Sequence, residues 1–137
     1  MPILPNRVIE IHDSTLVEIS QSNDETVLYF SSVYIHESEG VPGQDAGTGW
    51  SQRAILRLTD SRIVGAFSEF PVRLSNGRIL LGERATANGI PVPLRYEGTC
   101  ELRLEAFRQA HEIVTIEGKG IELELVGEGK YLEEFRP

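Results

Sequence analysis

The chain alternates apolar and polar residues at a period of two over much of its length. In the stretch GIELELVG, for example, Ile121 and Leu123 alternate with Glu122 and Glu124. Successive side chains of a strand point to opposite faces of a sheet, so this pattern predicts strands with one buried and one solvated side. The stretch TVLYFSSVYI at 26–35 is apolar on both faces at several positions, which is typical of a central strand.

Turn-forming residues separate these runs. SNGR at 75–78 contains the Asn-Gly pair that favours a two-residue hairpin, and GKG at 118–120 and GEGK at 127–130 predict further tight turns. We expect strands at about 3–4, 7–12, 15–21, 26–36, 51–60, 62–71, 78–84, 99–107, 111–118, 120–126 and 130–135. Many short strands joined by hairpins predict an all-β fold, either an antiparallel β-sandwich or a closed β-barrel, with little or no helix.

The length of 137 residues suits a single domain spanning residues 1–137. No apolar run reaches the 18 or more residues that a membrane span needs, and the N-terminus does not have the pattern of a signal peptide. The single cysteine, Cys100, excludes an internal disulfide, and the alternation in TCELRLEA places it on the apolar face of a strand. We therefore expect a cytoplasmic protein that does not bind membranes.

The net charge of −8 argues against binding to the phosphate backbone of nucleic acids. The charge is unevenly distributed: residues 1–50 have eight acids and one base, residues 51–96 three acids and seven bases, and residues 97–137 ten acids and five bases. An arginine-rich middle between acidic ends favours cross-strand charge pairing within one sheet over a basic groove.

The stretch HESEGVPGQDAGTGW at 36–50 differs most from its surroundings. It contains four glycines, a proline and the only tryptophan of the chain, and it is longer than most connections between strands. It lacks the lysine and the following helix of a phosphate loop, and its three carboxylates would repel a phosphate. Loops of this length are usually functional or mobile, so this is where we look first for a site.

Two kinds of site remain open for this stretch. His36, Glu37, Glu39 and Asp45 supply nitrogen and oxygen donors for a divalent cation, and His12 would complete the set if its strand is adjacent, although the spacing matches no dedicated metal motif. Alternatively, Trp50 would stack on a neutral polar ligand such as a sugar, with Gln52, Asp45 and Gln44 as hydrogen-bonding groups, unless the indole only plugs the end of the barrel or sandwich. The candidate ligand residues are His12, His36, Glu37, Glu39, Asp45, Trp50 and Gln52. The sequence requires no cofactor.

The stretch IHDSTL at 11–16 interrupts an apolar strand with three polar residues. Asp13 and Ser14 are good turn residues, so we expect a chain reversal here rather than a catalytic triad, which adjacent residues rarely form. Over about residues 9–30, the HDSxL opening followed by TVLYF resembles small uncharacterised bacterial all-β domains, some of them immunity proteins. The resemblance implies the fold class and brings no catalytic residues.

Three classes of function follow from these observations. The first is a non-catalytic domain that binds a protein partner, as immunity proteins do, and the acidic balance favours it. The second is a small-ligand or divalent-metal-binding β-barrel that uses the 36–50 stretch. The third, an enzyme with His36 and a carboxylate as its acid–base pair, is disfavoured because no nucleophile is placed beside it. An all-β domain of this kind also predicts a homodimer through an edge strand, for which 26–35 is the candidate.

Overall fold

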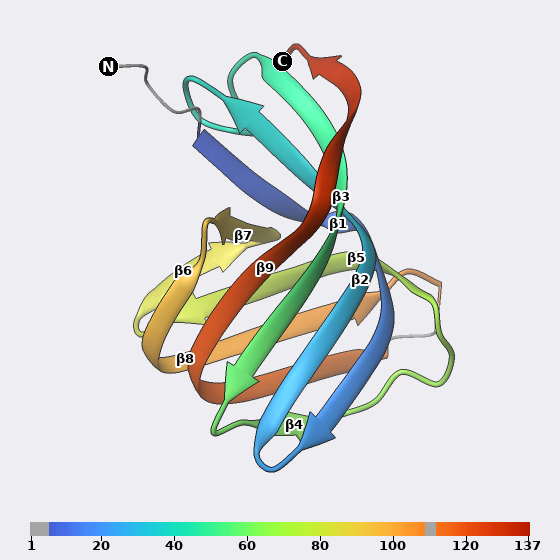
Figure 1. The fold of residues 1–137 in the computed structure, drawn as a ribbon, viewed down its shortest axis with the longest axis vertical. Helices are drawn as coiled ribbons and strands as arrows, with labels where there is room; N and C mark the ends of the chain where they lie inside the picture. The colour runs from blue at the N-terminus through green and yellow to red at the C-terminus, as the bar shows by residue number, and fades with distance from the viewer. Residues whose placement is uncertain (1–5, 109–111) are drawn as a thin grey trace.

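The computed structural model describes residues 6–108 and 112–137. These residues form β-strands and no helix (Figure 1). This confirms the predicted all-β class. The strands are β1 (Asn6–Ser22), β2 (Glu25–Ser38), β3 (Gly47–Thr59), β4 (Arg62–Val64), β5 (Val72–Leu81), β6 (Arg84–Ala87), β7 (Gly89–Val92), β8 (Arg95–Ala106) and β9 (Ile113–Phe135). These residues contain no helix with the length and apolarity that a membrane crossing requires. The strand expected at 3–4 lies outside the described residues.

Six of the strands close into a ring in the order β5-β8-β9-β3-β2-β1, and all neighbours are antiparallel. The ring closes where β1 pairs with β5 through Thr15 with Arg73 and Leu16 with Val72. The three short strands lie outside this ring: β6 pairs with β5, β7 with β1, and β4 with β9. The six strands therefore form a barrel-like ring.

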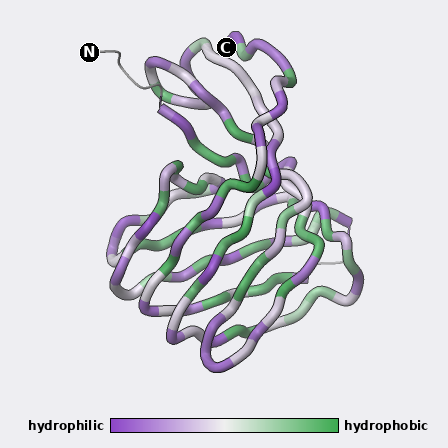
Figure 2. Tube along the Cα trace, viewed as in Figure 1, coloured by the Kyte–Doolittle hydropathy of each residue, from purple (hydrophilic) through white to green (hydrophobic). Residues whose placement is uncertain are grey.

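Large aliphatic side chains at alternate strand positions form the core of the protein. Leu56, Leu102 and Ile116 have no exposed surface, and Figure 2 shows the alternation of apolar and polar residues along the strands of the ring. Leu56 pairs with Leu28 on one side and Leu123 on the other. Because these side chains pack closely together, a binding site is to be sought on the outer surfaces.

Four strands continue beyond the ring and form a smaller part of the same sheet, which we call the extension (upper part of Figure 1). The extension consists of residues 6–10, 33–38, 47–52 and 130–135, and β7 pairs along residues 7–10. Register shifts separate it from the ring in all three strand pairs, between Glu10 and Thr15, between Phe30 and Val33, and between Ser51 and Arg53. Bulges of this kind bend strands, so they redirect the chain away from the ring.

The chain reversal expected at IHDSTL is wrong, because β1 runs without interruption from Asn6 to Ser22. Asp13 instead has a φ of 76°, a conformation that Asp adopts more readily than most residues. The polar interruption therefore marks the bulge at which β1 passes from the extension into the ring.

The Asn-Gly hairpin predicted at 75–78 is also wrong. Asn76 and Gly77 lie inside β5, and Gly77 is buried. A Cβ atom at Gly77 would lie 2.6 Å from the carbonyl oxygen of Arg103 on β8. The glycine thus permits the close approach of two strands, and the connection from β5 to β6 contains Gly82, with a φ of 64°.

The turns predicted at 118–120 and 127–130 are absent as well, because β9 continues through both glycine-containing stretches. A Cβ atom at Gly118 would lie 3.0 Å from the carbonyl oxygen of Thr59, so this glycine also serves a close approach. The strand expected at 62–71 is limited to β4, which is followed by Gly65 with a φ of 92°, outside the extended region.

The predicted pairing of the arginine-rich middle with the acidic ends is confirmed. Guanidinium groups of residues 51–96 contact carboxylates of the two end segments, most closely in the pair of Arg57 with Glu124 at 2.8 Å. The other such pairs are Arg62 with Glu117, Arg73 with Asp13, Arg78 with Glu101, and Arg95 with Glu122. The arginines are thus distributed over the sheet in pairs with acids.

Cys100 is 2 % exposed, as its place on the apolar face of a strand predicts. Burial raises the pKa of its thiol, while hydrogen bonds to the backbone of Gly120 and Gly118 act in the opposite direction. Since the thiolate is the reactive form, we expect a disulfide reagent at pH 8 to label Cys100 only after the protein is unfolded in urea. Native labelling as fast as that of a free thiol would contradict this burial.

Candidate functional site

The connection between β2 and β3 is shorter than the sequence predicts. β2 continues to Ser38 and β3 begins at Gly47, so the loop spans 39–46 rather than 36–50. The Oδ2 atom of Asp45 accepts a hydrogen bond from the backbone N–H of Val41 at 2.6 Å, and the backbone N–H of Asp45 donates to the carbonyl of Val41 at 2.8 Å. Asp45 is thus engaged by the backbone of its own loop.

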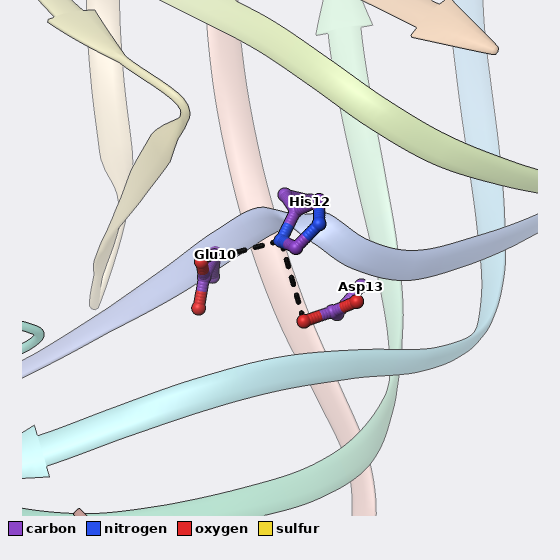
Figure 3. Close-up of side chains that lie close together, drawn as sticks. All are labelled: Glu10, His12 and Asp13. Carbon is purple, nitrogen blue, oxygen red and sulfur yellow. Dashed lines mark ion pairs between the residues drawn. The ribbon is translucent and has the colours of Figure 1, made fainter. Parts of the chain in front are cut away.

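His12 and His36 come together at Glu10, which the sequence did not single out. The Nε2 atom of His36 lies 2.7 Å from one carboxylate oxygen of Glu10, and Nδ1 of His12 lies 3.5 Å from the other. An ionised carboxylate only accepts hydrogen bonds, so the His36 ring donates to it. Figure 3 shows His12 near Glu10 and Asp13, all three on β1, with Nδ1 of His12 3.3 Å from Asp13.

Within residues 6–108 and 112–137, Glu10, His12 and Asp13 form the only group with ligand atoms close enough to share a metal ion, within 4.8 Å of one another. The same carboxylates are engaged elsewhere, since Glu10 accepts from His36 and Asp13 accepts from Arg73 at 3.0 Å. These contacts use the carboxylate oxygens that do not face His12, so a cation bound at His12 would share both carboxylates with His36 and Arg73. The geometry describes a network of ion pairs, and a divalent cation stays a prediction.

His36 is packed into the extension. The residue is 9 % exposed, and its ring makes edge contacts with Tyr34 and Phe135 at centroid distances of 4.7 and 5.0 Å. Its Nδ1 atom is buried without a hydrogen-bond partner among the described residues. A histidine that acts as acid or base has to reach its substrate, so this burial favours a structural role for the pair of His36 and Glu10.

Three other predicted residues lie on the opposite face of the extension. Glu37 follows His36 in β2 and therefore points the other way, and Trp50 and Gln52 of β3 share its side of the sheet. Together they line a depression of about 300 Å³ whose walls are Arg7, Ile35, Glu37, Trp50, Gln52 and Gly129. Arg7 lies directly opposite Glu37 in the pairing of β1 with β2.

Glu39 does not line the depression beside Trp50, and it shares a different hollow with Glu37. It is exposed and lines a hollow of about 550 Å³ at the tip of the extension, between the 39–46 loop and the end of β9. Glu134 also lines this hollow and binds Arg136 at 2.8 Å. The predicted ligand residues thus lie at several separate places instead of one shared mouth.

Tyr34 connects β2 to β9 across β3. Its hydroxyl donates to Oε1 of Glu133 at 2.8 Å, and Gly49 of β3 lies between the two, paired with His36 on one side and Glu133 on the other. A Cβ atom at Gly49 would overlap the phenol oxygen of Tyr34. Gly49 is therefore required because the Tyr34 side chain crosses directly over it.

We expect Gly49→Ala to lower the free energy of unfolding by about 1–3 kcal/mol, because it displaces the Tyr34 phenol from the Glu133 carboxylate. Urea unfolding of the two proteins measures this difference. Gly129→Ala is the matched control: its nearest neighbouring atom would lie 3.4 Å from the new methyl group, an ordinary contact, so we expect a change of less than about 0.5 kcal/mol. Equal effects of the two substitutions would contradict the assigned contact.

Tyr34 also predicts a loss of stability in alkali. Burial raises the pKa of its phenol, and the hydrogen bond and charge of Glu133 raise it further. A raised folded-state pKa contributes stability that is fully present below the unfolded value of about 10 and is lost as the pH rises through the folded value. We therefore expect the melting temperature of Tyr34→Phe to fall less steeply above pH 10 than that of the wild type, and parallel curves would contradict the linkage.

The sequence missed Arg7, Glu10, Tyr34 and Gly129. Arg7, Glu10 and Gly129 are distant in sequence from the 36–50 stretch, and β1 and β9 meet β2 and β3 only through the register of long strands. Tyr34 lies just before the stretch, but its hydrogen-bond partner Glu133 is on β9. The one usable signal was the polar interruption at IHDSTL, which marks the bulge beside Glu10. Register is set by turns and buried faces, and the turns predicted here were wrong.

Comparison of the chain with family models, with curated proteins and with solved structures finds no match. The function is therefore inferred from the residues and their geometry.

Proposed function

We propose that this chain is a non-catalytic interaction domain that binds an extended, basic segment of a protein partner along the free edge of β9. The observation that carries the proposal is that β9 pairs with β3 at 124–126 and again from Lys130 to Phe135, while no described strand pairs with residues 124–135 on the other side. An unpaired edge presents backbone N–H and C=O groups to which another chain can add a strand.

This edge is the longest one open in the described part of the chain, with twelve residues from 124 to 135. β6 and β7 have four residues each and β4 has three, and Pro91 removes a donor from β7. The open side of β1 beyond its contact with β5 is limited to residues 17–22. Length favours β9 because each added residue pair contributes backbone hydrogen bonds.

The charge of the edge favours a basic partner. Residues 124–135 carry four glutamates, Glu124, Glu128, Glu133 and Glu134, against the single Lys130. A basic segment is attracted to this edge, whereas a second copy of the same strand would bring like charges together, and like charges directly opposite each other destabilise strand pairing. The edge strand expected for a homodimer, 26–35, lies within β2, which is paired on both sides and is therefore not an edge.

Apolar side chains on the edge strand add contact area. Tyr131 and Leu132 are 49 % and 45 % exposed, and Tyr131 packs edge-on against Trp50 at a centroid distance of 5.4 Å. Added strands gain affinity from backbone hydrogen bonds and specificity from alternate side chains. A partner with apolar residues between its lysines would cover these two side chains.

A labelled twelve-residue peptide of alternating lysine and threonine tests the proposal by fluorescence anisotropy at about 50 mM salt, where charge screening is weak. We expect saturable binding with a Kd of about 10–100 µM, and no binding of a peptide with glutamate in place of lysine. The proposal would be overturned if neither peptide binds. It would also be overturned if sedimentation gives the mass of a dimer and the edge of β9 is covered in that dimer.

Two expectations belong to this proposal. The resemblance of residues 9–30 to immunity proteins, which act by binding a protein, is compatible with it. A cytoplasmic location is part of it too, since the single cysteine is buried and unpaired, as suits a reducing compartment.

A further inference from the structure

We infer that the depression beside Trp50 is a binding site for one saccharide ring. The site lies on the face of the extension away from His36, and its aromatic and polar side chains come from β1, β2 and β3, while β9 contributes only Gly129 to its lining. Its volume of about 300 Å³ is at the lower end of the range for small-ligand sites and suits a single sugar unit.

Trp50 supplies an apolar surface with its polar atom already satisfied. The indole N–H donates to the hydroxyl of Thr48 at 2.8 Å, and the ring is partly buried. Tyr131 packs edge-on against the indole, which fixes its orientation. A tryptophan held in this way offers its ring to the flat C–H face of a sugar.

Polar groups of both kinds surround this aromatic surface. Arg7 provides N–H donors and Glu37 provides acceptor oxygens, and no ion pair within 4.0 Å joins them among the described residues. Gln52 donates to the carbonyl of Gly127 at 2.7 Å, which leaves its amide oxygen as a further acceptor. Sugar hydroxyls donate and accept at once, so they match a site with donors on one side and acceptors on the other.

Gly129 keeps the depression open. A Cβ atom there would lie 3.6 Å from the Trp50 ring and 3.4 Å from the amide oxygen of Gln52. A larger side chain at this position would therefore occupy the place of the ligand, between the stacking surface and the polar group. This gives a variant that blocks the site without removing any of its binding groups.

Titration with glucose, galactose, mannose and N-acetylglucosamine tests the site, with the fluorescence of Trp50, the only tryptophan, as the readout. We expect a saturable change with at least one of the four, with a Kd in the millimolar range. Gly129→Leu should weaken that binding at least about tenfold, and Ala66→Leu, which adds the same side chain to an exposed loop, should not change it.

Arg7→Met keeps the length of the side chain and removes its donors, so it should also weaken binding while the melting temperature stays close to that of the wild type. Lack of response to all four sugars, or an unchanged affinity in Gly129→Leu, would overturn the inference. A response to a zwitterionic amino acid such as alanine, with none to sugars, would overturn it as well. Binding of the lysine–threonine peptide is measured separately, so either proposal can fail alone.

Discussion

Leu56→Ala is expected to lower the free energy of unfolding by about 2–5 kcal/mol. Leu56 has no exposed surface and sits in the middle of β3, between Leu28 and Leu123 of the neighbouring strands. The substitution removes buried methyl and methylene groups and leaves a cavity that the close-packed core fills only in part. Since small domains are stable by about 5–15 kcal/mol, this is a large share of the total, and urea unfolding measures it.

The adjacent residue provides the control. Ile55 is only partly buried and points to the opposite face of β3, where it lies across from Tyr29 and Glu124. We expect Ile55→Ala to cost about 1 kcal/mol or less. A larger loss for Ile55→Ala than for Leu56→Ala would mean that the core side of the ring is assigned to the wrong face of β3.

The double substitution Glu128→Lys with Glu134→Lys is expected to weaken binding of the lysine–threonine peptide at least about tenfold. Both glutamates are exposed on the free edge of β9, so lysines there would repel the lysines of an added strand. Exposed charge pairs contribute little singly, but each reversal both removes an attraction and adds a repulsion. Peptide anisotropy measures the change.

The matched control changes the net charge equally at exposed positions elsewhere. Glu18→Lys with Glu83→Lys alters one residue of β1 and one residue of the connection between β5 and β6. We expect this pair to change the affinity less than threefold, an effect of overall charge alone. An equal loss in both double variants would show that the peptide responds to net charge and not to the edge.

The all-β class could be predicted because it depends on local information. Alternation such as that of 120–127 directly reports which side chains face a core. The turns could not be predicted, because glycine has two uses that look alike in sequence. Gly77 and Gly118 are needed for close approach between strands, and these contacts come from residues far away along the chain.

The lining of the depression beside Trp50 was predicted in part for the same reason. Trp50, Gln52 and Glu37 come from one hairpin, and their convergence follows from strand alternation once β2 and β3 are paired. Arg7 and Gly129 complete the depression from β1 and β9, which only the register of the sheet brings there. Sequence reasoning therefore found the local half of this lining and grouped His36 with it, although His36 lies on the opposite face of the extension.

Hydrogen–deuterium exchange with and without the lysine–threonine peptide tests the central proposal most directly. Backbone amides that join a new strand become protected, whereas a merely electrostatic contact leaves backbone exchange unchanged. We expect slower exchange within residues 124–135 when the peptide is bound, with no change at 17–22, which is a shorter open edge. Binding without protection in 124–135, or protection confined to 17–22, would contradict it.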